Sequence, residues 1–299
     1  ATEDGVSLGY NIYFRETDYG EFNVANYLTN SNGLGAQFGY PISDITRLGF
    51  SLTYDKTDID IGTLPAREIY DFVAAEGNLF ETLSAQASWQ RVTLNRGLFP
   101  TSGSSTVLSL SATIPGSDLN YYRANIRQRY YRPLSNNFVF GFQGELGYLN
   151  AYGDTEETPF FQNFYAGGPR SLRGFESNTL GPRSTDAPCY EFNYEEETCP
   201  NLIDTDGDGV LDSPYINPYA NTTSRYRDRP IGGNIKIEGS LQLIFKLPII
   251  EDQRSIRSAF FLDFGNVFSD NCRDYQINCY KPSVEDLRYS YGVGGTWIT

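Results

Sequence analysis

Four aspartates stand at the spacing of a calcium-binding loop. They occupy positions 1, 3, 5 and 9 of a nine-residue run with glycine at position 6: Asp204, Asp206, Asp208 and Asp212. Carboxylate oxygens that converge around a tight turn are ligands that Ca²⁺ prefers. The bidentate glutamate of an EF-hand is missing, because Tyr215 stands at position 12. The run predicts a Ca²⁺ site, and the alternative is a solvated acidic turn.

The cysteines form two close pairs, Cys189/Cys199 and Cys272/Cys279, each inside a polar segment. In an oxidising compartment, neighbouring cysteines in polar loops predict disulfides. Closing loops this short contributes ~2–3 kcal/mol each in the chain-entropy treatment. A metal site is the weaker alternative, because the spacing is too long for a C-x₂₋₄-C motif and the chain has no histidine.

Composition argues against two classes of function. The absence of histidine removes the usual general base and the commonest metal ligand, which argues against an enzyme. The 37 acidic and 23 basic residues give a net charge of -14. Such a charge argues against nucleic acid as a partner.

Apolar and polar side chains alternate over ten segments. Between 108 and 114, leucine, alanine and isoleucine take the even positions, and serine and threonine take the odd ones. This period of two is the pattern of a β-strand with one apolar face. The ten segments lie near 5–15, 33–43, 46–56, 81–93, 108–114, 122–130, 138–148, 235–245, 256–268 and 287–298. Most have roughly the ~9–11 residues that a tilted membrane strand requires.

The connections between these segments alternate in length. Short turns at 41–46 and 132–137 alternate with long polar links, the longest at about 151–232. Short turns at one end and long loops at the other are typical of an outer-membrane barrel. A soluble β-sandwich is the alternative, but it gives no reason for long loops on every second connection. The pattern predicts an all-β, antiparallel transmembrane barrel.

Membrane-spanning helices are not expected. The mean hydropathy is -0.42, and no stretch reaches the ~18–20 consecutive apolar residues that a spanning helix needs. One short helix is predicted at 66–76, where Ile69, Phe72 and Val73 form a stripe. We expect it to pack against the barrel rim, and membrane or partner binding is the alternative.

The long link carries a family motif. Leu172, Arg173, Gly174 and Phe175 match a V/L-R-G-F/Y pattern, with Gly-Gly before it and Leu-Gly-Pro after it. In this motif the chain resembles the Omp85 family of outer-membrane proteins. Similar segments occur at 4–8, 95–100, 113–118, 232–234 and 260–265, so the resemblance covers nearly the whole chain. The first cysteine pair also fits the family, whereas the second is an addition.

The resemblance implies a sixteen-stranded barrel preceded by periplasmic POTRA domains. Residues 1–299 would then be a partial barrel, running from about the fifth strand into the fourteenth, without the POTRA domains and without the seam strands. The lack of methionine also suggests a processed or excised segment. Ten strands should not close, so we expect a curved wall with two open edges.

The resemblance also assigns a role to the motif. In the family this loop enters the lumen, and its arginine meets acidic groups on the barrel wall. Here Asp263, on the inward face of its strand, is the matching acid for Arg173. A second family acid is replaced by Gln242, and Glu238 on the same inward face is expected to compensate. The simpler alternative is that Arg173 only anchors a plug loop.

The implied function is the folding and insertion of β-barrel proteins into the bacterial outer membrane. The expected partners are the outer-membrane lipid bilayer, unfolded client barrels, and assembly lipoproteins bound through the POTRA domains. No cofactor is required beyond the Ca²⁺ predicted above. The alternatives are a related Omp85 transporter, either a TamA-like insertase or a polypeptide secretion pore, and a passive porin, which the plug-like loop argues against.

Overall fold

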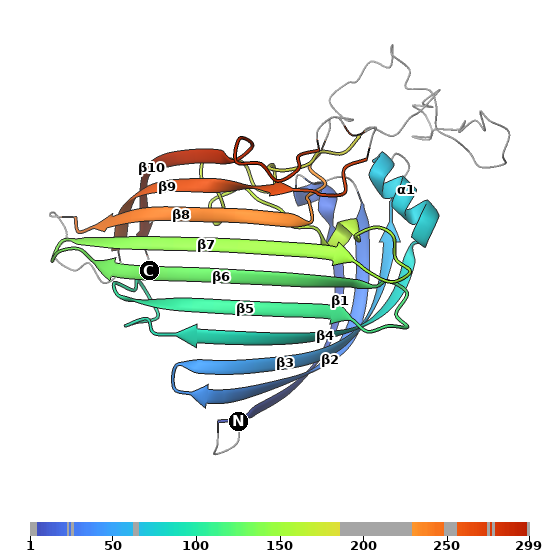
Figure 1. The fold of residues 1–299 in the computed structure, drawn as a ribbon, viewed down its shortest axis with the longest axis horizontal. Helices are drawn as coiled ribbons and strands as arrows, with labels where there is room; N and C mark the ends of the chain where they lie inside the picture. Colours follow the sequence, from blue (N-terminus) through green and yellow to red (C-terminus); the bar gives the residue numbers. More distant parts are fainter. Residues whose placement is uncertain are drawn as a thin grey trace, which may run out of the picture.

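A computed structural model describes residues 5–22, 24, 27–61, 66–185, 229–247, 256–273, 276 and 279–297. These residues form one ten-stranded antiparallel sheet in which each strand pairs with its neighbours in sequence (Figure 1). The strands are β1 Ser7–Asp18, β2 Leu28–Ser43, β3 Thr46–Asp60, β4 Leu79–Val92, β5 Gly103–Thr113, β6 Tyr121–Pro133, β7 Phe138–Ala151, β8 Ile235–Phe245, β9 Ile256–Phe268 and β10 Arg288–Trp297. All ten predicted strands are therefore confirmed.

The sheet is a curved wall with two edges, as Figure 1 shows. In the described part of the chain, β1 pairs with β2 alone and β10 pairs with β9 alone. The expectation that ten strands leave the barrel open is confirmed.

The two faces of the wall differ in polarity. The inner face is the one against which the connection between β7 and β8 lies, and it carries side chains such as Ser240 and Asp263. The outer face carries exposed apolar side chains at the alternate positions, including Phe260 and Leu262 on β9. An apolar outer surface suits the hydrocarbon of a bilayer, and a polar interior suits a lumen.

The two ends of the sheet also differ. At the turn end, on the left of Figure 1, short connections join β2 to β3, β4 to β5 (93–102) and β6 to β7 (134–137). At the loop end lie the longer connections, including 61–78, 152–234 and 269–287. The longest connections therefore all lie at one end, as is typical of an outer-membrane barrel.

The loop end holds a core of its own. Helix α1 (Arg67–Glu76) buries Ile69 and Phe72 against Phe80 of β4 and Phe160 of a short 3₁₀-helix, Phe160–Gln162. A second 3₁₀-helix spans Tyr19–Phe22. The helix thus packs at the barrel rim, as its apolar stripe predicts. No helix among the described residues is long and apolar enough to cross a membrane.

Candidate functional site

The connection after β7 folds back against the inner face, and we call residues 160–182 the lumen loop. Its two arms are bridged where the Leu180 amide donates to the Ala166 carbonyl oxygen (3.2 Å). We call residues 167–176, which include the motif, the tip of this loop. Within the tip, the Gly168 amide donates to the Leu172 carbonyl oxygen (3.1 Å), and Leu172 is fully buried. The Tyr165 hydroxyl donates to the Ile231 carbonyl oxygen (3.2 Å), and burial raises the pKa of this phenol, so the donor proton is retained.

Arg173 and Asp263 meet in a bidentate ion pair. The Arg173 Nε lies 2.7 Å from Asp263 Oδ2, and Nη2 lies 2.6 Å from Oδ1. The Arg173 amide also donates to Oδ2 (3.1 Å), so one carboxylate accepts three hydrogen bonds. Asp263 is completely buried. Parallel N–H···O bonds between a guanidinium and a carboxylate fix orientation as well as distance, so this pair sets how the tip docks on the wall.

Two further wall residues complete the environment of Arg173. Its Nη2 donates to Ser240 Oγ on β8 (3.0 Å). Its guanidinium carbon lies 3.5 Å from the ring centroid of Phe261 on β9. A cation over an aromatic face at this distance is attracted by the ring quadrupole. In this chain one carboxylate, one hydroxyl and one aromatic ring hold the arginine.

The two other expected wall partners lie elsewhere, which corrects the sequence-based assignment. Gln242 donates to Ser240 Oγ (3.2 Å) and reaches Arg173 only through that hydroxyl. Glu238 does not contact Arg173. It accepts a hydrogen bond from Ser171 Oγ and pairs with Lys236 Nζ (3.0 Å). The reason is position along the strand, because Ser240 and not Glu238 is the residue opposite Asp263.

Glu238 therefore fixes a different point of the lumen loop. Ser171 Oγ accepts the Gly167 amide (2.9 Å) while its hydroxyl donates to Glu238, which links the loop backbone to β8. Lys236 continues this network to Glu145 on β7 (3.5 Å). The motif tip is thus tied to the wall at two adjacent carboxylates, Asp263 through Arg173 and Glu238 through Ser171.

A second cation–aromatic contact holds the base of the loop. The Arg123 guanidinium carbon of β6 lies 4.1 Å from the ring centroid of Phe164, and its Nη1 lies 3.5 Å from the Gln162 carbonyl oxygen. Gly147 leaves room for that ring, since a Cβ there would lie 2.6 Å from it. At the base the wall supplies the cation, whereas at the tip the loop does. The sequence motif did not identify Arg123, although strand alternation places this residue on the polar face.

We expect Arg123 and Phe164 to be energetically coupled. A double-mutant cycle of Arg123→Leu and Phe164→Leu should give a coupling energy of about 0.5–2 kcal/mol. Hydrogen exchange of the amides at 160–166 measures it in the folded barrel. Phe164→Tyr is the control, because it keeps an aromatic face and should retain most of the protection. Strictly additive effects of the two substitutions would contradict the coupling.

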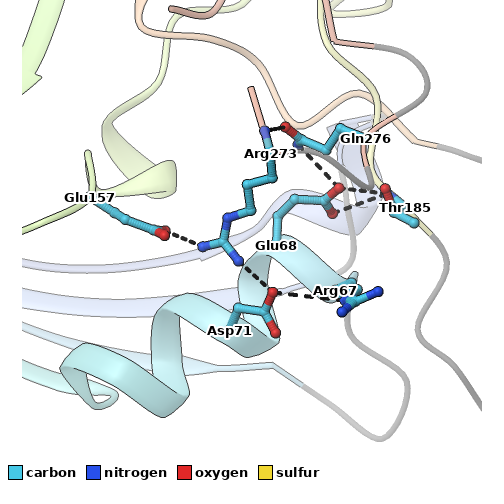
Figure 2. A network of polar contacts seen from close by, with 7 residues as sticks. All are labelled: Arg67, Glu68, Asp71, Glu157, Thr185, Arg273 and Gln276. Carbon is cyan, nitrogen blue, oxygen red and sulfur yellow. Dashed lines mark hydrogen bonds and ion pairs between the residues drawn. The ribbon is translucent and has the colours of Figure 1, made fainter. Parts of the chain in front are cut away.

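A polar cluster joins three connections at the loop end (Figure 2). Arg273, next to Cys272, pairs with Asp71 on α1 and with Glu157 of the connection after β7. Glu68 accepts the Thr185 amide at both oxygens (3.0 Å each) and the side-chain amide of Gln276 (3.1 Å). Figure 2 shows Arg273 between its two carboxylates, so this residue connects α1 to two other segments.

The disulfide Cys272–Cys279 is present in this cluster. We expect Arg273→Ala to loosen α1, because partly exposed pairs of this kind contribute about 0.2–1 kcal/mol each. Hydrogen exchange of the α1 amides should become about threefold to tenfold faster. Lys281→Ala, an exposed cation of the same connection, should leave α1 unchanged. Equal effects of the two substitutions would argue against a specific clasp.

Two sequence-based assignments lie outside the described residues. They are the disulfide Cys189–Cys199 and the Ca²⁺ site of Asp204, Asp206, Asp208 and Asp212. Both stay predictions, and calorimetric titration with Ca²⁺ tests the second. Among the described residues, no group of three or more His, Cys, Asp or Glu side chains is arranged to hold a metal ion.

Comparison with known proteins gives one family. The Omp85 superfamily domain matches residues 1–299. The outer membrane protein assembly factor BamA of Neisseria meningitidis is 28% identical over all of this chain and 36% of its own length. The mouse sorting and assembly machinery component 50 homolog is 21% identical over 92% of this chain and 50% of its own.

Solved structures agree. A crystal structure of BamA from Haemophilus ducreyi, lacking POTRA domains 1–3, superimposes with a TM-score of 0.76 at 27% identity. The match covers 99% of this chain and 53% of that one. The chain thus spans between about a third and a half of the relatives it matches. With a family match over every residue and the BamA barrel fold, the chain belongs to the Omp85 superfamily of outer-membrane β-barrels.

Proposed function

We propose that this chain is the barrel part of a bacterial outer-membrane assembly factor that folds and inserts client β-barrels. The observation that carries the proposal is the lumen loop, whose motif arginine is held by Asp263. The surrounding Omp85 barrel resembles part of BamA over all residues of this chain. A bacterial rather than a mitochondrial membrane is favoured by the higher identity and fuller coverage of the bacterial relative.

The mechanism that we propose involves no covalent chemistry. An unfolded client would pair its strands with exposed strand edges at a lateral seam, because unsatisfied edges template new strands. Local thinning of the bilayer would lower the cost of bringing polar backbone across lipid. The lumen loop would act as a fixed internal support, since its two cation–aromatic contacts join β6 to β9.

The partners in this proposal follow from the same assignment. They are the bilayer, unfolded client barrels, and assembly lipoproteins that bind through POTRA domains. Because residues 1–299 span only part of the relatives that they match, the test uses the full-length protein. The competing candidate is an Omp85 transporter, either TamA-like or a secretion pore, which would pass an extended polypeptide.

The test uses full-length protein with its co-purified partners in proteoliposomes. Folding of an unfolded client barrel is followed by its heat-modifiable gel mobility, and translocation by protease protection of the client inside the vesicles. We expect faster client folding than in empty liposomes of the same lipids. A client that folds no faster than in empty liposomes, or that crosses the bilayer unfolded, would exclude the insertase and favour the transporter.

A further inference from the structure

The turn end carries arginines next to exposed apolar side chains. In the connection 93–102, Arg96 and Leu98 are both exposed, and Arg91 is exposed just before it at the end of β4. Arg132 and Leu134 are both exposed where β6 meets its turn. The arginine is thus paired with an apolar tip at two successive turns.

The remaining described turn has the same apolar character. Between β2 and β3, Ile42 and Ile45 are exposed on either side of Asp44, and Arg47 follows on the inner face. Its charges balance, so the excess of positive charge at the turn end comes from the other two turns.

Hydrogen bonds hold these two turns in place. In the first, Asn95 Oδ1 accepts the amides of Thr101 (3.1 Å) and Ser102 (3.3 Å), and Arg96 Nε donates to the Phe99 carbonyl oxygen (2.6 Å). In the second, Ser135 Oγ accepts the amides of residues 137 and 138. Turns tied down in this way present their side chains in a fixed direction, at less entropic cost on binding.

Strand register places Arg91 at the edge of the apolar outer surface. Trp89, Leu108 and Ile126 lie opposite one another on β4, β5 and β6. Two residues nearer the turn end on the same three strands, the next outward row holds Arg91, Thr106 and Gln128. On β4, β5 and β6 the outer surface therefore changes from apolar to polar within one outward position, as at a membrane–water interface.

The three arginines of the turn end, Arg91, Arg96 and Arg132, have no carboxylate partner among the described residues. Arg127, on the inner face of β6, does have such a partner, since it pairs with Glu145 (3.1 Å). The outward cations are thus available to an external anion.

The two ends of the molecule have opposite charge. The loop end carries carboxylates such as Glu68, Asp118 and Glu156, and the chain as a whole has a net charge of -14. An anionic surface would repel such a protein except at its turn end, where cations near the surface are attracted to anionic lipid.

We propose that the turn end binds anionic phospholipid headgroups of the leaflet that it faces, through Arg91, Arg96 and Arg132. A lipid fits this surface better than an acidic protein segment does, because Arg91 follows directly on the apolar outer surface, at the level where phosphate headgroups meet the hydrocarbon. The inference rests on the membrane barrel and is independent of the proposed assembly function.

The test measures lipid selectivity of the full-length protein reconstituted in phosphatidylcholine vesicles. Trace spin-labelled phosphatidylglycerol or phosphatidylcholine reports the fraction of lipid held at the protein surface. The test variant combines Arg91→Gln, Arg96→Gln and Arg132→Gln. The matched control removes the same charge from the inner face and the lumen loop, as Arg47→Gln, Arg129→Gln and Arg170→Gln. Heat-modifiable mobility establishes that each variant is folded.

We expect the wild type to prefer phosphatidylglycerol, and each outward arginine to contribute roughly two- to fivefold at low salt. The outward triple variant should lose this preference, the control should keep it, and added salt should weaken it. No preference in the wild type, or an equal loss in both variants, would overturn the proposal. A different result would also overturn it: polyglutamate displaces the lipid, and the outward triple variant keeps its preference for phosphatidylglycerol. That result would point to an acidic polypeptide bound in the lumen instead.

Discussion

Replacing Arg173 by alanine is expected to release the tip of the lumen loop from the wall while leaving the strands paired. The substitution removes the bidentate partner of a fully buried carboxylate. An uncompensated buried charge costs on the order of 3–5 kcal/mol. Undocking of the tip relieves that cost by admitting water to Asp263. Hydrogen exchange should therefore rise by about a hundredfold or more at the tip amides, including that of Gly168, which donates to the Leu172 carbonyl oxygen.

The control for this prediction lies in the same loop. Arg170 is exposed, so Arg170→Ala removes the same charge without opening the contact with Asp263. It should leave exchange at the tip within about twofold of the wild type. Arg173→Lys should give an intermediate result, because a lysine keeps the charge but not the bidentate geometry. Full protection of the tip in Arg173→Ala would show that the ion pair does not hold the loop.

Gly167→Ala is expected to disrupt the same tip through the backbone. Gly167 has a φ of 107°, a conformation that residues with a side chain rarely adopt. An added Cβ would lie 2.4 Å from the Glu176 carbonyl oxygen, a backbone atom that cannot move without shifting the loop. Strain of about 1–3 kcal/mol and this steric overlap act together. We expect tip protection to fall by at least tenfold, measured by hydrogen exchange.

Gly116 separates the backbone strain from the steric overlap. It also has a positive φ of 100°, but a Cβ there would have nothing within 4 Å. Gly116→Ala should therefore report the strain alone, as a loss of protection confined to the connection between β5 and β6. If Gly167→Ala lowers the hydrogen-exchange protection of its own segment no more than Gly116→Ala does, the contact with Glu176 is not decisive.

Alternation of side chains was sufficient to predict the wall. On β9, Phe260, Leu262 and Phe264 share one face, so Asp263 had to point to the other. The same reasoning applies to all ten strands, because a one-residue shift would turn every apolar side chain towards the lumen. The helix at the rim was equally readable from its apolar stripe.

The partners of the lumen loop were harder to predict. Arg173 and Asp263 are 90 residues apart, and they were linked only through the family motif. Glu238 was expected beside Arg173 but contacts Ser171. The sequence shows which face of a strand a residue lies on, but not the position along the strand at which a loop docks. Arg123 and Phe261 escaped notice for a related reason. A contact between a cation and an aromatic ring has no sequence pattern when its partners lie on different elements.

The central claim is that assembly activity depends on a lumen loop fixed to the wall by Arg173 and Asp263. Its most direct test is client folding in proteoliposomes by the full-length complex carrying Arg173→Ala, with Arg170→Ala alongside and barrel folding verified by heat-modifiable mobility. The account predicts that client folding by Arg173→Ala falls towards the rate in empty liposomes, while Arg170→Ala matches the wild type. Client folding at the wild-type rate by a correctly folded Arg173→Ala complex would contradict it.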